Sequence, residues 1–205
     1  FDRSSVLHGL DDDARELLEA AAIVHNVGLF ISHSSHHKHS YYVIRNSEQL
    51  TGFTEHEIEL IAVVARYHRK SRPSGKHPEF AALSADDQRL VRQLAGMLRV
   101  AIGLDRRHAR VVQTMRVHID DGWMRIEPVA DGADDLDLEV YAARERAHLL
   151  ADALGVDVEI VDAIFTEVTN KVLARFGEMT FRWFIDQLFA NLAKANLYGL
   201  IAVSF

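Results

Sequence analysis

Three polar residues occupy helix positions where the surrounding pattern predicts apolar side chains. His25 follows Ala21 by four residues and Leu18 by seven, so it lies on the apolar face of a predicted helix. His68 and Asp105 extend apolar faces in the same way, and all three stand near the C-terminal ends of their helices. Such side chains can converge at one mouth of a helical bundle, where ligand and metal sites are commonly built. Separate core residues, each satisfied by a hydrogen bond, are the alternative.

Imidazole and carboxylate groups bind several divalent metals, and a metal held by them activates water for attack on a phosphate ester. The residue after His25 is Asn26, however. A neutral amide is a weak ligand that cannot offset the charge of a cation. The sequence therefore predicts a degenerate metal site at His25, Asn26 and Asp105, which could accept a divalent metal, and it assigns no catalytic residue.

Two segments of the chain carry cations and no acid. Residues 32–47 contain Lys38, Arg45 and four histidines, and residues 66–76 contain five arginines and lysines. The net charge of the whole chain is -7, so a polyanion would have to bind such a local patch. Arginine, lysine and hydroxyl groups are the usual donors to phosphate oxygens. These segments, with the serine and tyrosine hydroxyls beside them, therefore predict a surface for a simple polyanion.

Three other interpretations of these segments stay open. A basic face that is merely solvated is common on globular proteins. A histidine cluster can also hold a metal, through His33 and His37 one helical turn apart or through His37 and His39 on a strand. Nucleic-acid binding is less favoured, because the aromatic residues available for stacking are only Tyr41, Tyr42 and Tyr67.

Hydrophobic periodicity predicts a mainly α fold with a small α+β part. Residues 1–108 show helical patterns, including a start at Asp11 with Gly28 as a stop, and a capping box at Thr54. Near residue 109 the period changes to strict alternation, with a turn at 120–122, which predicts a β-hairpin. A helix over 138–154 and a strand over 156–161 follow. We therefore expect a helical domain at 1–108, a small α+β subdomain at 109–161 and an amphipathic helical tail at 162–205.

Composition narrows the class of protein. The chain has no cysteine, which excludes disulfides and thiolate metal sites, and its 48% hydrophobic and 26% charged residues indicate a globular domain. No apolar stretch reaches the roughly 20 residues that span a bilayer, and no secretory signal begins the chain. We expect a cytoplasmic protein without a membrane anchor, in which the tail packs as a helix pair or joins a homodimer. The absence of an initial Met suggests a piece of a longer protein.

Five stretches of the sequence, taken in order, resemble the C-terminal region of the exopolyphosphatase / guanosine pentaphosphate phosphatase (Ppx/GppA) family. The stretches are His25-Asn26-Val27-Gly28-Leu29, His33-Ser34, His37-Lys38-His39-Ser40-Tyr41-Tyr42, Arg66-Tyr67-His68-Arg69-Lys70 and Leu98-Arg99-Val100-Ala101-Ile102-Gly103-Leu104-Asp105-Arg106. The resemblance covers roughly residues 1–161 and leaves the tail unmatched.

This resemblance implies an HD-like helical domain that helps to hold polyphosphate, while an N-terminal phosphatase module with Mg²⁺ performs hydrolysis. The ligand would be inorganic polyphosphate or a guanosine polyphosphate. The chain itself would need no cofactor and would form part of a hydrolase without being its catalytic domain. The implied polyphosphate-facing or domain-interface residues are His33, Ser34, His37, Lys38, His39, Ser40, Arg66, His68, Arg69 and Lys70.

Two alternatives from other classes stay open at this point. One is a free-standing HD phosphohydrolase that acts on a nucleotide through His25, His68 and Asp105 with a divalent metal. The other is a non-catalytic dimerisation module that uses residues 162–205.

Overall fold

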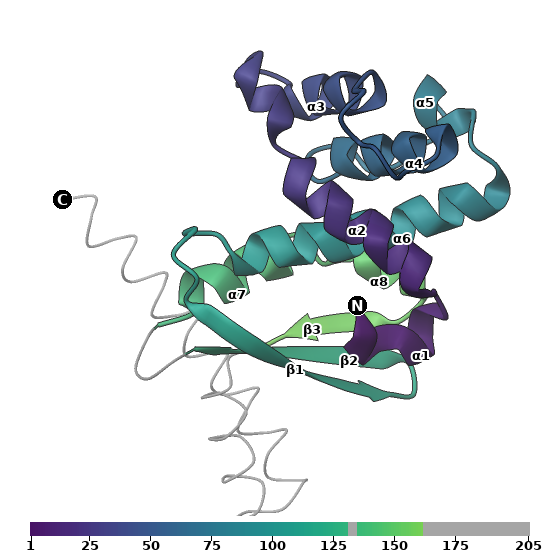
Figure 1. Cartoon of the computed structure of the whole chain (residues 1–205). Coiled ribbons are helices and arrows are strands. Elements are labelled where there is room, and N and C mark those ends of the chain that lie inside the picture. The colour runs from purple at the N-terminus through teal and green to yellow at the C-terminus, as the bar shows by residue number, and fades with distance from the viewer. Residues whose placement is uncertain (131–134, 162–205) are drawn as a thin grey trace, which may run out of the picture. The chain divides into compact units, whose positions relative to one another are not determined.

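Three of the four longer helices in the described residues begin at a capping side chain. A computed structural model describes residues 1–130 and 135–161 and contains helices α2 (Asp12–Val24), α3 (His36–Arg45), α4 (Glu55–Arg66) and α6 (Ala85–Leu104) (Figure 1). The Asp11 side chain accepts a hydrogen bond from Ala14 N–H at the start of α2, at 3.0 Å. Thr54 and Glu57 form the predicted capping box of α4. These caps satisfy N–H groups that the first helical turn leaves without partners.

Helix α4 lies at the centre of the helical core. Leu60 is 3% exposed, and the five residues after it are completely buried. Helices α2, α3 and α6 pack against α4 and share its hydrophobic cluster, which also includes Phe80 of the short helix α5 (Pro78–Ala81). This packing brings the C-terminal ends of α2 and α4 close to the start of α3, where the histidines are.

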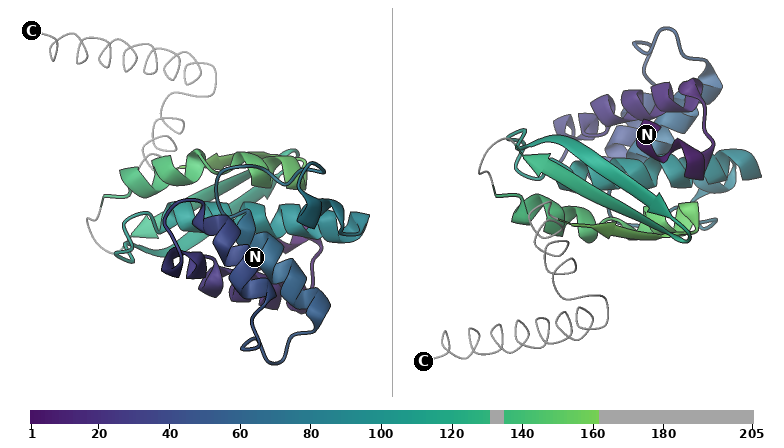
Figure 2. Two further views of the ribbon diagram at one scale, coloured as in Figure 1. Left: turned by 90° about the horizontal axis from the view of Figure 1, so that it is seen from above. Right: turned by 90° about the horizontal axis from the view of Figure 1, so that it is seen from below.

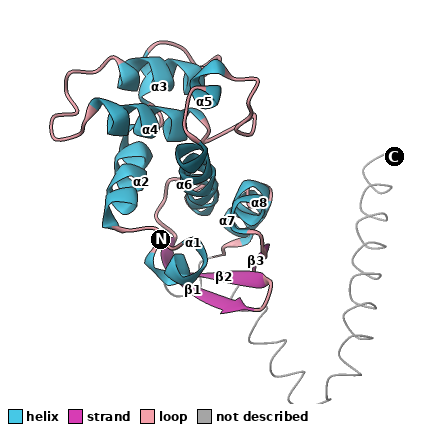
Figure 3. Cartoon of the chain, turned by 90° about the vertical axis from the view of Figure 1, so that its right-hand side faces the viewer, coloured by secondary structure: helices cyan, strands magenta, loops and turns pink. Residues whose placement is uncertain are grey.

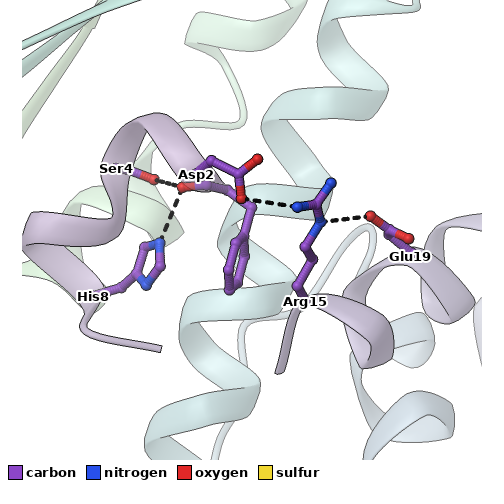
Figure 4. A network of polar contacts seen from close by, with 6 residues as sticks. Asp2, Ser4, His8, Arg15 and Glu19 are labelled. Atoms are coloured by element: carbon purple, nitrogen blue, oxygen red, sulfur yellow. Dashed lines mark hydrogen bonds and ion pairs between the residues drawn. The ribbon is translucent and has the colours of Figure 1, made fainter. Parts of the chain in front are cut away.

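The first residues fold back on α2 through a polar network (Figure 4). They form the 3-10 turn η1 (Asp2–Ser4) and the single-turn helix α1 (Ser5–His8). The Phe1 carbonyl accepts from Ser4 Oγ at 3.0 Å and lies 3.1 Å from His8 Nε2. Arg15 contacts Asp2 at 3.2 Å and Glu19 at 2.9 Å, so one guanidinium links the start of the chain to α2.

A three-stranded sheet covers one side of α6 (Figures 2 and 3). Strands β1 (Val112–Asp120) and β2 (Trp123–Ala130) form the predicted antiparallel hairpin, and β3 (Asp157–Ile160) pairs in parallel with β2. The hairpin turn uses Gly122 at φ 77°, a backbone conformation that favours glycine. A second hydrophobic cluster fills the space between this sheet and the helices above it, with Val100 from α6 and Met124 from β2.

The predicted helix over 138–154 is two helices instead of one. The structure contains α7 (Asp137–Arg144) and α8 (His148–Leu154), with a turn at 145–147 between them. Both pack against α6, on the side away from α2 (Figure 3). An added Cβ on Gly96 would lie 2.8 Å from Leu150 Cα, and one on Gly103 would lie 2.5 Å from Ala143 Cα. Glycine therefore allows the backbones to approach closely at two points.

The described residues confirm a mainly α fold with a small α+β part. They belong to one compact unit, in which residues 109–161 lie against the helical part through the second cluster. The predicted tail at 162–205 lies outside the described residues. Within the described part, no helix combines the length and the hydrophobicity needed to cross a bilayer.

Candidate functional site: a histidine cluster beside unpaired cations

Three histidines from different elements meet at one end of the helical core. His25 caps the C-terminus of α2, His36 begins α3, and His68 follows α4. The rings of His36 and His68 stack with centroids 5.2 Å apart, and His25 meets His68 edge-on at 5.0 Å. The predicted convergence of His25 and His68 is therefore confirmed.

Short polar contacts link two members of this cluster to each other and to Arg69. His68 Nδ1 lies 2.6 Å from the Ala65 carbonyl oxygen and donates to it, which leaves His68 Nε2 of the neutral ring as an acceptor. His36 Nε2 lies 3.2 Å from His68 Nε2. His36 Nδ1 lies 3.2 Å from the His33 carbonyl oxygen and 3.2 Å from Arg69 Nη1. A continuous chain of contacts therefore runs from the Arg69 guanidinium through two imidazoles to a helix-end carbonyl.

Burial disfavours the protonated form of these imidazoles. It lowers the pKa of His68 to about 3, and the neighbouring His25, His36 and Arg69 lower it further against the Ala65 hydrogen bond. Burial also lowers the pKa of His36 and of His25. Neutral imidazoles beside a guanidinium add no repulsion, so Arg69 keeps its charge available for an anion.

His37 also has a lowered pKa, but one of its ring nitrogens has no hydrogen-bond partner. It is 7% exposed, and its Nδ1 atom is buried with no hydrogen bond. Burial lowers the pKa of His37 to about 4, and the cations Arg66, Lys70 and Arg69 lower it further. A buried polar atom without a hydrogen bond is uncommon in native proteins, so His37 Nδ1 is an unsatisfied position within the basic region.

Ser40 is a structural residue in this arrangement. It is fully buried, and its hydroxyl donates to the His25 carbonyl at 2.7 Å and accepts from Gly28 N–H at 3.0 Å. Gly28 was predicted to stop α2, but α2 ends at Val24 and Gly28 lies in the 3-10 turn η2 (Val27–Phe30). An added Cβ on Gly28 would lie 2.2 Å from the His36 carbonyl oxygen, so glycine is required there for close approach to α3.

Three of the seven cations in the two basic segments are paired with acids. Arg66 contacts Glu79 in a largely buried ion pair, and Arg72 contacts Asp152 at the surface. Arg45 contacts both Glu55 and Glu59. Among the described residues, the cations of these segments without a carboxylate partner are Lys38, Arg69, Lys70 and Lys76.

The structure separates the residues assigned by resemblance into two groups. Exposed or half-exposed residues are His33, Ser34, Lys38, His39, Arg69 and Lys70. His37, Ser40 and His68 are buried, and the Arg66 side chain is 12% exposed. Only the first group can touch a large ligand directly without a rearrangement, while the second group supports the backbone that presents it.

Two residues of the predicted metal site, Asn26 and Asp105, lie at the ends of different elements. Asp105 caps the C-terminus of α6, and its carboxylate contacts His108 at 3.3 Å. Asn26 precedes η2. Within residues 1–130 and 135–161, no group of three or more histidine, aspartate or glutamate side chains has an arrangement that could hold a metal ion. The strand interpretation for His37 and His39 is wrong, since both lie in α3.

Sequence reasoning missed the central histidine. His36 stood in the basic segment but was not chosen as a site residue, although it contacts His68, Arg69 and His37. The signal was available in its spacing, because His36, Ser40 and Ile44 recur every four residues and form the buried face of α3. Arg99, buried below the 67–71 turn, was also missed as a site residue.

Among the described residues, the helical core thus ends in a cluster of buried histidines beside Arg69 and Lys70. The chain matches the family described as Ppx/GppA phosphatase, domain III, over residues 3–147. It belongs to the Ppx/GppA phosphatase family. It is 33% identical over 112 residues to a guanosine-5'-triphosphate,3'-diphosphate pyrophosphatase of Pseudoalteromonas translucida (strain TAC 125). That alignment covers 54% of this chain and 22% of the relative, so the chain corresponds to a minor part of the relative's length.

Proposed function

We propose that this chain is the phosphate-polyanion-binding part of a Ppx/GppA-type hydrolase. Arg69 carries the proposal, because it is exposed, lacks a carboxylate partner and is held by His36 at 3.2 Å. Lys70 follows it in the same turn and adopts φ 58°, an unfavourable conformation for a residue with a side chain. Such strain is maintained where the surrounding structure requires it, as at ligand-binding sites.

The ligand we infer has several closely spaced phosphates. Arg69 and Lys70 are adjacent in the turn after α4, beside the His36–His68 pair, so one short phosphate chain can contact both cations. The relative's name favours a guanosine polyphosphate as the ligand, and inorganic polyphosphate fits the same cations. Hydrolysis would belong to a separate N-terminal phosphatase module that uses Mg²⁺. The homodimer and the cytoplasmic location stay predictions.

Calorimetry with the whole 205-residue chain tests the proposal. The Arg69→Ala, Lys70→Ala double variant removes two exposed cations together with their hydrogen-bond donors. We expect binding of inorganic polyphosphate at low salt to weaken by about tenfold or more, since a charge-assisted hydrogen bond contributes about 1.5–3 kcal/mol. The control is Arg89→Ala, Arg116→Ala, which makes the same change in net charge at exposed positions outside the site. Equal weakening in both variants would mean that only the overall charge matters.

A parallel titration with guanosine pentaphosphate distinguishes the two ligand classes. If the guanosine compound binds at least tenfold more tightly than polyphosphate of similar charge, the nucleoside is recognised. No binding of either compound by the unmodified chain at low salt would overturn the proposal. Binding that is present should fall steeply as salt rises from 50 to 200 mM, because exposed charges are screened.

A further inference from the structure

Arg99 has an unusual position for a cation. It is 8% exposed in α6, and its guanidinium donates to the Tyr67 carbonyl at 2.6 Å, the Lys70 carbonyl at 3.1 Å and the Ser71 carbonyl at 2.7 Å. Three carbonyls satisfy its hydrogen bonds, but no carboxylate among the described residues contacts it. Burial lowers the pKa of Arg99 to about 10, and the nearby Arg72 and Arg146 lower it further. A buried, uncompensated charge therefore lies directly under the turn that presents Arg69 and Lys70.

Close backbone packing places Arg146 opposite Arg99 of α6. Gly96 packs against Leu150, and Gly103 packs against Ala143, so this part of α6 runs antiparallel to the chain from α7 to α8. Arg99 lies three residues after Gly96, and Arg146 lies four residues before Leu150. The two arginines are therefore neighbours across the helix interface, although they belong to parts of the fold on either side of residue 109.

Arg146 also lacks an ion pair among the described residues. Its guanidinium donates to the Ala142 carbonyl at 2.6 Å, and the side chain is half-buried. Burial lowers its pKa, and so do Arg106 and Arg69, while the adjacent Glu145 opposes them. The Arg72–Asp152 ion pair joins the segment after the 67–71 turn to α8, and Arg99 donates to the Lys70 and Ser71 carbonyls. The 67–71 turn therefore lies beside the part of the chain that carries Arg146.

We propose that Arg69 and Arg146, with the buried Arg99 between their backbones, form a phosphate-binding subsite at the junction of the helical and α+β parts. Several guanidinium groups without carboxylates repel one another in the unliganded protein, and a phosphate group relieves that repulsion. Planar guanidinium groups also offer paired donors that match phosphate oxygens. The inference rests on the proposed function. It extends that function by adding residues of the α7–α8 turn to the polyanion site.

The test uses the whole chain and tripolyphosphate. Arg146→Gln should weaken tripolyphosphate binding about tenfold in calorimetry at low salt, as expected for one charge-assisted contact. Arg116→Gln, which removes an exposed arginine on β1, should change it less than about twofold. In the unmodified chain, tripolyphosphate should protect Arg146 from phenylglyoxal, measured by mass spectrometry of the peptide, while Arg116 stays reactive.

The possible outcomes separate the two proposals. If tripolyphosphate binds, the Arg69→Ala, Lys70→Ala variant loses binding, and Arg146 is neither protected nor needed, then the subsite is wrong and the proposed function stands. If the unmodified chain does not bind tripolyphosphate or polyphosphate at all, the proposed function itself fails. Protection of Arg146 is read in the unmodified protein, so the result does not depend on whether the Arg146→Gln variant folds.

Discussion

His36 Nε2 lies 3.2 Å from His68 Nε2, and both residues are at least nine-tenths buried. This contact joins the start of α3 to the end of α4, and Arg69 extends it to the surface. A hydrogen bond between these two nitrogens requires that the two rings are not both protonated, because two protonated rings would present donors to each other. The consequences for stability can be measured directly.

Acid should destabilise the protein through His68. Its pKa is lowered to about 3 in the folded chain from the ordinary value of 6.5, so between these values the unfolded chain binds the proton more readily. The stabilising contribution is therefore complete above pH 6.5 and decreases as the pH falls. From pH 7 to pH 5 we expect a loss of about 2 kcal/mol from this residue, measured by urea unfolding. Over the same pH range, the free energy of unfolding of a His68→Gln variant should fall by about 2 kcal/mol less. An unchanged pH dependence in that variant would contradict the role assigned to His68.

Gly28→Ala should destabilise the fold strongly. The added Cβ would lie 2.2 Å from the His36 carbonyl oxygen and 2.3 Å from Ser40 N, and both atoms belong to the α3 backbone. Relief requires separation of η2 from α3, so we expect a cost of about 3 kcal/mol. Gly75→Ala is the matched control, since a Cβ there meets nothing within 4 Å. Similar midpoints in thermal unfolding for the two variants would show that η2 can move freely.

Glu79→Ala should cost far more than Asp152→Ala. Arg66 and Glu79 have side chains that are 12% and 13% exposed, so loss of the carboxylate leaves a nearly buried guanidinium without its ion pair. We expect a cost of about 3–5 kcal/mol for Glu79→Ala. The Arg72–Asp152 pair has side chains that are 53% and 62% exposed, and its loss should cost less than about 1 kcal/mol. Chemical denaturation at pH 7 compares the two, and equal costs would refute the distinction.

Ser40→Ala tests whether this hydroxyl in the basic segment is structural. The variant leaves Gly28 N–H and the His25 carbonyl without their shared partner in a buried place. We expect a loss of about 1–3 kcal/mol in the free energy of unfolding. Ser34→Ala, at an exposed position of the same segment, should change it by less than about 0.5 kcal/mol. If Ser40→Ala reduced polyphosphate affinity without any loss of stability, the hydroxyl would instead be a ligand contact.

The sequence by itself determined the local features of this protein. The Asp11 cap, the Thr54–Glu57 capping box and the β-hairpin were all predictable, because caps and alternation act over a few neighbouring residues. The break between α7 and α8 was not predicted, since the apolar pattern continues through it. The meeting of His25 with His68 followed from their places at helix ends.

Only the tertiary structure decided which of the charged and polar residues remain available to a ligand. Arg66 meets Glu79 through the packing of α5, and Arg72 meets Asp152, which is 80 residues away in the chain. The same packing places Arg146 across the helix interface from Arg99 and buries His37 Nδ1 without a hydrogen bond. Ion pairs and burial depend on side chains that are distant in sequence, so charge counts along the chain could indicate a basic region but could not show which cations in it are already neutralised.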